Sequence, residues 1–198
     1  MLVIGLTGSI AMGKSEAARY LASLGLPIFD SDAEVHKLYE GEQGAQLIRP
    51  YVPEATVNGK VDRKTVSDAV LKDPALLLAL EKNVHAEIRQ RRQHFIAQAE
   101  MTGAKAAILD IPLLYETGAE KDVDKVIVIS APPEIQRLRA LARPGMTESR
   151  LAMILAKQLP DVDKRAKADA VIDNNSTLQQ MQNNLHILAV KWGLISNA

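Results

Sequence analysis

The segment with the clearest chemical signature lies near the N-terminus and reads Gly-Ser-Ile-Ala-Met-Gly-Lys-Ser over residues 8–15. Its spacing fits G-x-x-x-x-G-K-[ST], the pattern of a phosphate-binding loop between a strand and a helix. In such a loop the amides at the start of the helix wrap the β-phosphate, Lys14 neutralises β- and γ-phosphate oxygens, and the Ser15 hydroxyl binds Mg²⁺. The alternative interpretation is a glycine-rich turn followed by a surface lysine.

The segments on both sides of the loop predict the strand and the helix that it requires. Leu2 to Leu6 is a short apolar run typical of a buried strand, and Lys14 to Leu24 carries apolar residues at helical spacing. Leu26 to Phe29 predicts a second strand, and Ser31-x-x-Glu34 fits a capping box that opens another helix. This order of strands and helices favours binding of ATP or GTP by the loop.

The rest of the chain contains a helical region and a second group of strands. No strong strand signal is present between Gly41 and Gly103, and helices are expected to start at Asp62 and Asp73. The second of these is long, and its core-facing stripe comprises Leu77, Leu80, Val84, Ile88, Phe95 and Ala99. Further strands are expected at 104–109, 125–129 and 170–172. Further helices are expected at 133–142 and, after a Thr147 cap, at 148–158. A last helix is expected after a Ser176 cap, with Leu178 facing the core.

Three aspartates follow predicted strands, at the edge where α/β sheets bind ligands. Asp30 and Asp32 follow the second strand, and either could accept a proton from an attacking hydroxyl. Alternatively, Asp32 complements the dipole of the next helix and Asp30 caps a turn. Asp110 ends the third strand, where it would either reach the shell of a Mg²⁺ ion or serve only as the acid of a turn.

Two groups of polar residues lie on predicted helices. Gln136, Arg139 and Arg143 share one helical face, which is either solvated or part of a lid that brings guanidinium groups to phosphates. His85 and Arg89 lie four residues apart on the long helix and either form a surface network or contact a substrate.

The composition excludes several classes of protein. The chain has 198 residues, 47% of them hydrophobic, and no cysteine, which excludes disulfides and thiol catalysis. Its 24 basic and 24 acidic residues cancel, so we expect no nucleic acid as a partner. No apolar run approaches the roughly 20 residues that span a bilayer, and the N-terminus lacks a basic signal-peptide region. We expect a cytoplasmic protein without a membrane partner, and the oligomeric state is left open.

Together these segments resemble the dephospho-CoA kinase family over nearly the whole chain. Members of that family phosphorylate the ribose 3′-hydroxyl of dephospho-CoA, the last step of coenzyme A biosynthesis. The matching segments are Gly5-Leu6-Thr7-Gly8, Asp30-Ser31-Asp32, Asp62-Arg63, His85-Ala86-Glu87-Ile88, Asp110-Ile111-Pro112-Leu113-Leu114-Tyr115-Glu116, Gln136-x-x-Arg139-x-x-x-Arg143, Gln158 and Ala168-Asp169-Ala170-Val171-Ile172. The segment that begins at Asp110 is the most diagnostic of them.

The resemblance implies an α/β fold of the P-loop NTPase type. A five-stranded parallel sheet would be flanked by helices, with a helical substrate-binding insertion and a lid. The implied organisation is a single domain over residues 1–198, with its core at 1–40 and 104–198, a substrate region at about 41–103 and a lid at about 136–158.

The resemblance also implies the ligands, which are ATP, Mg²⁺ and dephospho-CoA, and the residues that meet them. Asp32 would be the general base, with Lys14 and Arg143 as further catalytic residues. The implied nucleotide contacts are Gly8, Ala11, Met12, Gly13, Lys14, Ser15, Glu16, Arg139 and Arg143. The implied substrate contacts are Asp32, His85, Arg89, Asp110 and Leu113, and the implied metal ligands are Ser15 and Asp110.

Three positions depart from the family pattern. Ala11 stands where glycine is usual, Glu16 where threonine is usual and Ala86 where proline is usual. Ala11 costs energy only if its φ is positive. Glu16 brings an anion near the phosphates, which its place in the first helical turn partly offsets. Ala86 is expected to leave the long helix without a kink.

Two alternative functions remain open at this stage. Another small P-loop nucleotide kinase would share the architecture, although the segment at Asp110 argues against it. A nucleotide-binding module that has lost catalysis is suggested by Ala11 and Glu16. A GTPase-like switch would need an Asn-Lys-x-Asp element to read the base, and the sequence contains none.

Overall fold

A computed structural model describes residues 1–196, apart from the side chain of Pro74. The chain folds into two compact units. The first unit comprises Met1–Phe29 and the chain from Ile96 onward, and the second comprises Asp30–Phe95. In the described part of the chain no helix is both long enough and apolar enough to cross a membrane.

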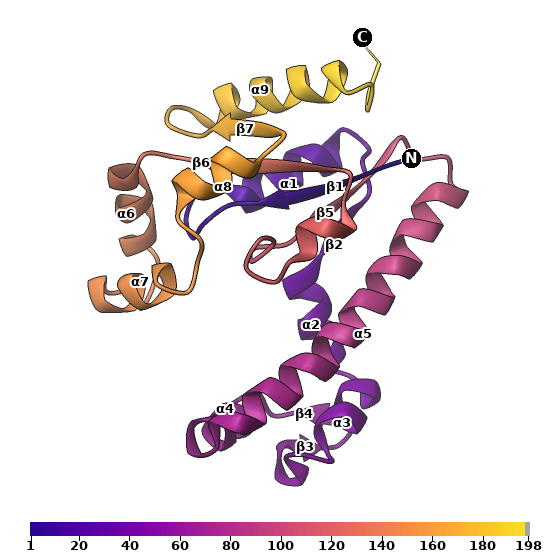
Figure 1. Cartoon of the computed structure of the whole chain (residues 1–198), viewed down its shortest axis with the longest axis vertical. Helices are drawn as coiled ribbons and strands as arrows, with labels where there is room; N and C mark the ends of the chain where they lie inside the picture. Colours follow the sequence, from indigo (N-terminus) through magenta and orange to yellow (C-terminus); the bar gives the residue numbers. More distant parts are fainter. Residues whose placement is uncertain (197–198) are drawn as a thin grey trace. The chain divides into compact units, whose positions relative to one another are not determined.

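The first unit is built on a five-stranded sheet with the strand order β2-β5-β1-β6-β7 (Figure 1). The strands are β1 (Leu2–Thr7), β2 (Ile28–Asp30), β5 (Ala106–Asp110), β6 (Lys125–Ser130) and β7 (Ala170–Asp173). The expected five-stranded parallel sheet is confirmed. β1, β5 and β6 are almost entirely buried, as their continuous apolar runs predict for strands covered on both faces.

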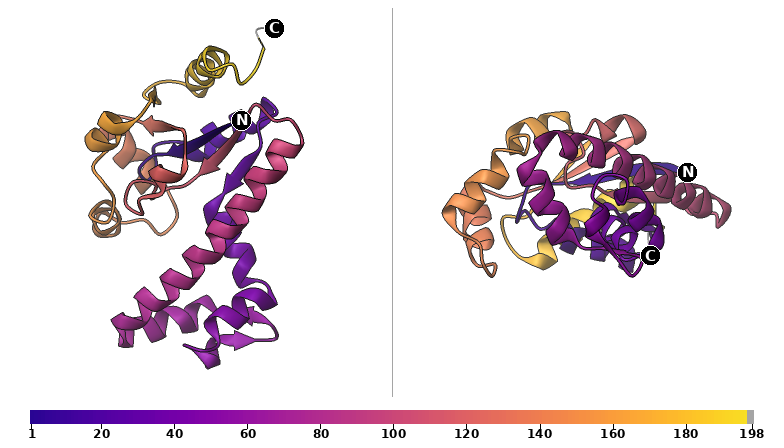
Figure 2. Two further views of the ribbon diagram at one scale, coloured as in Figure 1. Left: turned by 45° about the vertical axis from the view of Figure 1, so that its right-hand side comes forward. Right: turned by 90° about the horizontal axis from the view of Figure 1, so that it is seen from below.

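Helices and short connections complete this unit. They are α1 (Lys14–Ser23), the 3₁₀ helix η2 (Ala119–Asp122), α6 (Pro133–Leu141), α7 (Glu148–Leu155), α8 (Asp161–Lys167) and α9 (Leu178–Lys191). α1 and α9 pack against one another and against the sheet, and Figure 2 shows α9, in yellow, alongside the strands. Leu21 of α1 and Met181 and Leu185 of α9 are buried there against Ile4 and Ile129. This packing holds α1, and with it the phosphate loop, on the sheet.

The second unit is mainly helical. It contains α2 (Ser31–Tyr39), α3 (Glu42–Ile48), the 3₁₀ helix η1 (Pro53–Ala55), strands β3 (Thr56–Val57) and β4 (Lys60–Val61), α4 (Arg63–Lys72) and most of α5 (Pro74–Met101). Figure 1 shows α3, α4 and the β3–β4 hairpin beside the N-terminal part of α5. Arg91 of α5 ties this unit together, because it bonds to Glu87 on its own helix, to Glu34 of α2 and to Gln43 of α3.

Several local expectations are confirmed. Asp62 caps α4, Thr147 caps α7, and α5 is one continuous helix through Ala86, as expected where alanine replaces proline. The chain leaves α5 through Gly103, whose φ of 74° is typical of a helix C-terminus.

Two expected helix caps are wrong by one residue. Asp30, rather than Ser31, caps α2, because its Oδ1 accepts a hydrogen bond from the Ala33 amide at 2.9 Å. Thr177, rather than Ser176, caps α9. In both cases the neighbouring residue also has a short oxygen-bearing side chain, so the choice depends on which residue keeps an extended backbone.

Other expectations fail for tertiary reasons. Asn58-Gly59 turns the chain with φ of 51° and 73° and creates the β3–β4 hairpin in a region where the sequence predicts no strand. Leu77 and Leu178 are exposed by 41% and 48% rather than facing the core, because each lies in the first turn of its helix, before the packed part begins. The local pattern does not predict α8 either.

Candidate active site

The phosphate loop joins β1 to α1, in the order that its sequence pattern requires. Gly13 precedes α1 with a φ of 99°, a left-handed conformation that favours glycine. A Cβ built on Gly8 would lie 2.6 Å from the main-chain oxygen of Ile129, so this position also excludes a side chain. The two glycines of the motif are therefore required by geometry, and the first amides of α1 face the position of an anion with the positive end of the helix dipole.

Lys14 and Asp110 are brought together by the pairing of two parallel strands. Leu6 of β1 lies opposite Asp110 at the end of β5, and Lys14 begins α1 after the intervening loop. Lys14 Nζ forms an ion pair with Asp110 Oδ1, whose side chain is almost completely buried. The lysine ammonium is thus held at the carboxyl end of the central strands, where this sheet type binds ligands.

Side-chain amides from the expected lid region hold the N-terminal part of the loop. Gln136 Nε2 donates to the main-chain oxygen of Ile10 at 2.9 Å, and Gln158 Oε1 accepts from the Ile10 amide at 3.1 Å. Gln136 is buried, so the face of α6 that it shares with Arg139 is not simply solvated, while Arg143 lies in the turn after α6 instead of on the expected helical face.

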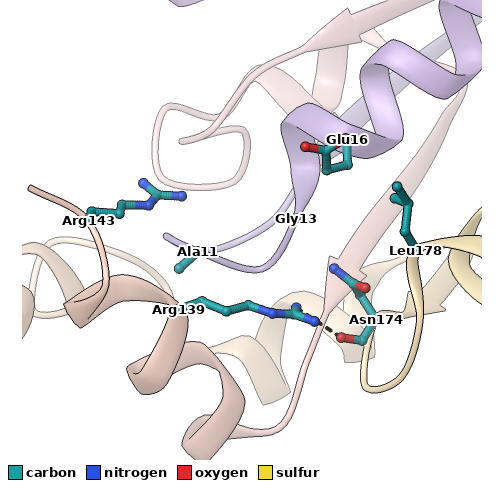
Figure 3. Close-up of a pocket in the computed structure, with 7 residues that line it drawn as sticks. All are labelled: Ala11, Gly13, Glu16, Arg139, Arg143, Asn174 and Leu178. Carbon is teal, nitrogen blue, oxygen red and sulfur yellow. Dashed lines mark hydrogen bonds between the residues drawn. The ribbon is translucent and has the colours of Figure 1, made fainter.

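A pocket of about 350 Å³ lies over the loop (Figure 3). It is lined by Ala11, Gly13, Glu16, Arg139, Arg143, Asn174 and Leu178. Arg139 Nη1 donates to the main-chain oxygen of Asn174 at 3.0 Å, while Arg143 is exposed and its guanidinium group points into the open space over the loop. The charged residues of the lining are two arginines and one glutamate, so the lining carries the net positive charge that binds a polyphosphate.

Two of the three departures from the family pattern lie at this pocket. Ala11 has a φ of 62°, so the condition for a strained alanine is met. Its methyl group is buried against Ala140 of α6 and Leu151 of α7. The carboxylate of Glu16 forms an ion pair with Arg19 on the next turn of α1, which reduces its repulsion toward an anion.

The remaining expected site residues are distributed between the units. Leu113 belongs to the first unit, follows β5 and is partly exposed. Asp32, His85 and Arg89 belong to the second unit and are exposed, Asp32 in the first turn of α2 and the other two on α5. Because Asp30 is committed to capping α2, Asp32 is the aspartate of this pair whose side chain is not needed for the cap.

The residues at the site fit a Mg²⁺ ion. Ser15 and Asp110 supply hydroxyl and carboxylate oxygens, the hard donors that Mg²⁺ prefers. Within residues 1–196 no group of three or more acidic or histidine side chains forms a metal cage.

Sequence reasoning missed two buried polar residues near the site. Asn174 follows β7 and contacts the phosphate loop. Its position as a polar residue directly after a predicted strand could have marked it as a site residue. Lys164 of α8 is completely buried and pairs with Glu116 at 2.8 Å. No signal identified Lys164, because α8 itself was not expected.

The sheet, the loop and the arginine-lined pocket together define a nucleotide-binding protein of the P-loop class. A family model described as dephospho-CoA kinase matches residues 2–180. The chain belongs to the dephospho-CoA kinase family.

Individual relatives agree with this assignment. A dephospho-CoA kinase of Bradyrhizobium diazoefficiens is 50% identical over 190 residues, which cover 96% of this chain and 95% of the relative. The structure is similar to that of a dephospho-CoA kinase from Campylobacter jejuni, with a TM-score of 0.73, 26% identity, and coverage of 96% and 98% of the two chains. It is also similar to the crystal structure of a Thermus thermophilus protein, with a TM-score of 0.82, 32% identity, and coverage of 96% and 97%.

Proposed function

We propose that this protein transfers the γ-phosphoryl group of ATP to the ribose 3′-hydroxyl of dephospho-CoA, giving coenzyme A and ADP. The observation that carries the proposal is the complete phosphate loop, with Lys14 held at Asp110, in a chain of the dephospho-CoA kinase family. The observed site thus has the main requirement of phosphoryl transfer, which is electrostatic stabilisation by groups already in place.

The loop and the lid supply positive charge to the polyphosphate. We assign the main-chain amides from residue 11 to residue 16 to the β-phosphate and Lys14 to the β- and γ-phosphate oxygens. Arg139 and Arg143 line the pocket over the loop, where planar guanidinium groups can bind phosphate oxygens in pairs. Ser15 and Asp110 would hold the Mg²⁺ ion, which when bound neutralises phosphate charge. The lid at about 136–158 would carry the arginines.

Asp32 is our candidate for the general base that accepts the proton of the 3′-hydroxyl. The assignment follows from its position directly after β2 and from the family resemblance, and the cap role of Asp30 supports it. His85, Arg89 and Leu113 are the candidate substrate contacts, with about 41–103 as the substrate region. We place the reaction in the cytoplasm, where ATP is available.

Production of coenzyme A is the direct test of this function. The protein is mixed with ATP, Mg²⁺ and dephospho-CoA, and a parallel series replaces dephospho-CoA with nucleoside monophosphates. We expect coenzyme A and ADP in equal amounts and little transfer to the monophosphates. Preferred phosphorylation of a monophosphate would support the alternative nucleotide kinase, and ATP binding without turnover would support a module that has lost catalysis.

The base assignment is tested by a matched pair of variants. Asp32→Asn is expected to keep ATP binding and to lower kcat by roughly 10²- to 10⁴-fold, the usual contribution of a positioned base. Asp30→Asn is the control, because asparagine is also a good N-cap and should leave most of the rate intact. A larger loss from Asp30→Asn than from Asp32→Asn would reverse the assignment.

A further inference from the structure

Asn174 connects three elements of the nucleotide site. It follows the last residue of β7, is 7% exposed, and donates its main-chain N–H to the oxygen of Ser130 at the end of β6 (2.7 Å). Its side-chain Nδ2 donates to the main-chain oxygen of Met12 in the phosphate loop at 2.9 Å. Its own main-chain oxygen accepts the hydrogen bond from Arg139 (Figure 3). One buried residue therefore contacts both the loop and the lid arginine.

The contact between Asn174 and the loop is close. A Cβ built on Gly13 would collide with Nδ2 of Asn174, so glycine is needed at this position for space as well as for its positive φ. The sulfur of Met12 also accepts a hydrogen bond, from the Ala131 amide at 3.0 Å. Met12 is thus held at its side chain by the residue that follows β6, and at its peptide oxygen by the residue that follows β7.

The orientation of the Met12 peptide matters for anion binding. A phosphate loop binds its ligand through main-chain N–H groups, and a carbonyl oxygen turned toward the same ligand would repel it. The bond from Asn174 occupies the Met12 oxygen and opposes such a rotation. The bond from the Asn174 main chain orders Arg139, which would otherwise sample several rotamers.

We propose that Asn174 is a positioning residue for the nucleotide, with its side chain fixing the Met12 peptide and its main-chain oxygen aiming Arg139. The inference rests on the proposed function, because it concerns the ATP site of the same reaction. Only the contact with Met12 depends on the asparagine side chain, so a substitution at Asn174 removes this contact and keeps the main-chain oxygen that accepts from Arg139.

Two substitutions at Asn174 test the side-chain contact. Asn174→Ala removes the donor, and Asn174→Asp keeps the shape but replaces the donor with an acceptor. Each should lower kcat/KM for ATP by about 10- to 100-fold, the scale expected when a buried polar group loses its partner. KM for dephospho-CoA should change by less than about twofold, because uniform substrate binding is not affected. Asn175→Ala and Asn175→Asp, at the exposed neighbouring asparagine, are the matched controls and should behave as wild type.

The melting temperature separates positioning from a merely structural role. A structural role would lower the melting temperature of Asn174→Ala and leave KM for ATP and kcat per folded molecule unchanged, which would overturn the inference. If Asn174→Ala does not fold, the melting temperature, KM for ATP and kcat of the isosteric variant Asn174→Asp are compared with those of wild type instead. Failure of the wild-type protein to make coenzyme A would count against the proposed function alone. Asn174 would then be tested by calorimetry, in which the Asn174 variants should bind ADP about 10- to 100-fold more weakly than wild type.

Discussion

The ammonium group of Lys14 and the carboxylate of Asp110 form an ion pair at the carboxyl ends of β1 and β5. Both groups are largely removed from water, so their attraction is stronger than that of a surface pair. Phosphates entering the loop would bring a competing partner for Lys14, and Asp110 would then be available to the Mg²⁺ ion of the proposed function. The pair therefore holds both side chains in the site before the nucleotide arrives.

Lys14→Ala should lower the rate of phosphoryl transfer by about 10²- to 10³-fold. The substitution removes the positive charge on the β- and γ-phosphate oxygens, where loss of one stabilising group costs about 3–4 kcal/mol of transition-state stabilisation. Turnover of coenzyme A formation is the measurement, and Lys72→Ala on the exposed end of α4 is the control. A Lys14→Ala rate within about threefold of wild type would contradict the loop assignment.

Arg143→Lys should lower kcat although the charge is preserved. A lysine ammonium cannot form the paired hydrogen bonds that a guanidinium group makes to phosphate oxygens. Arg137→Lys is the matched control, because Arg137 lies on α6 and forms an ion pair with Glu148 instead of lining the pocket. Equal rates for the two variants would remove Arg143 from the catalytic residues.

Ala11→Gly should leave the free energy of unfolding nearly unchanged. Glycine relieves the strain of a positive φ, worth roughly 1–2 kcal/mol. It also removes a methyl group buried against Ala140 and Leu151, worth about 0.8 kcal/mol, and it adds flexibility to the unfolded chain. Urea unfolding and ATP affinity are measured together, and we expect ATP to bind as tightly as in wild type or several-fold more tightly.

Asn58→Gly is the control for this substitution. Asn58 also has a positive φ, but it is exposed in the hairpin of the second unit, so no change in ATP affinity is expected. A loss of ATP affinity in Ala11→Gly alone would show that the buried methyl group stabilises the binding conformation of the loop.

Lys164→Met should lower the free energy of unfolding of the first unit. Lys164 is completely buried, and its Nζ bonds to Glu116 at 2.8 Å and to the main-chain oxygen of Pro112 at 3.4 Å. The substitution removes the cation beside Glu116, which keeps its hydrogen bond from the Leu159 amide at 2.7 Å, so we expect a loss of about 1–3 kcal/mol, the scale of a lost hydrogen-bond partner. The double variant Lys164→Met with Glu116→Gln should recover part of this loss in urea unfolding. A single variant as stable as wild type would contradict the expected contribution of the Lys164–Glu116 pair.

Tyr115→Phe should make the protein less sensitive to alkaline pH. Burial, together with the negative charges of Asp169 and Glu120, raises the pKa of Tyr115 to about 12. The phenol ionises near pH 10 in the unfolded chain, so wild-type stability is lost as pH rises from about 10 to 12. Phenylalanine removes this loss.

The phenylalanine variant should also be at least as stable as wild type near neutral pH. Among the residues that the structure describes, the buried Tyr115 hydroxyl has no hydrogen-bond partner, so its removal ends a desolvation cost. The free energy of unfolding is measured at pH 8 and pH 11, and the change between these two values in Tyr51→Phe, at an exposed tyrosine, is the control. A steeper alkaline loss in Tyr115→Phe than in wild type would contradict the assignment.

Local patterns in the sequence determined the strands of the first unit, helices α1, α6, α7 and α9, and the position of the phosphate loop. A strand is predicted from a short apolar run, and a phosphate loop from glycine and lysine at a set spacing. Residues 2–15 contain both patterns, so they predict β1 and the phosphate loop without any contact from the rest of the chain. Local patterns also predicted α5 and the caps at Asp62 and Thr147, because the interactions that form them join residues only a few positions apart in the chain.

The contacts around the loop depend on tertiary structure instead. Asn174 and Met12 are separated by 162 positions, and Gln158 and Ile10 by 148, yet the fold places both pairs within hydrogen-bond distance. The positive φ of Ala11 also follows from the path of the folded loop, since alanine by itself favours a negative φ.

The sequence alone thus determined the chemistry of the nucleotide site, because residue types and short spacings specify which groups can bind phosphate. Tertiary structure decided which side chains hold those groups in place, and whether Asp30 caps α2 or Lys164 is buried. Such choices depend on packing between residues far apart in the chain, which no local pattern contains.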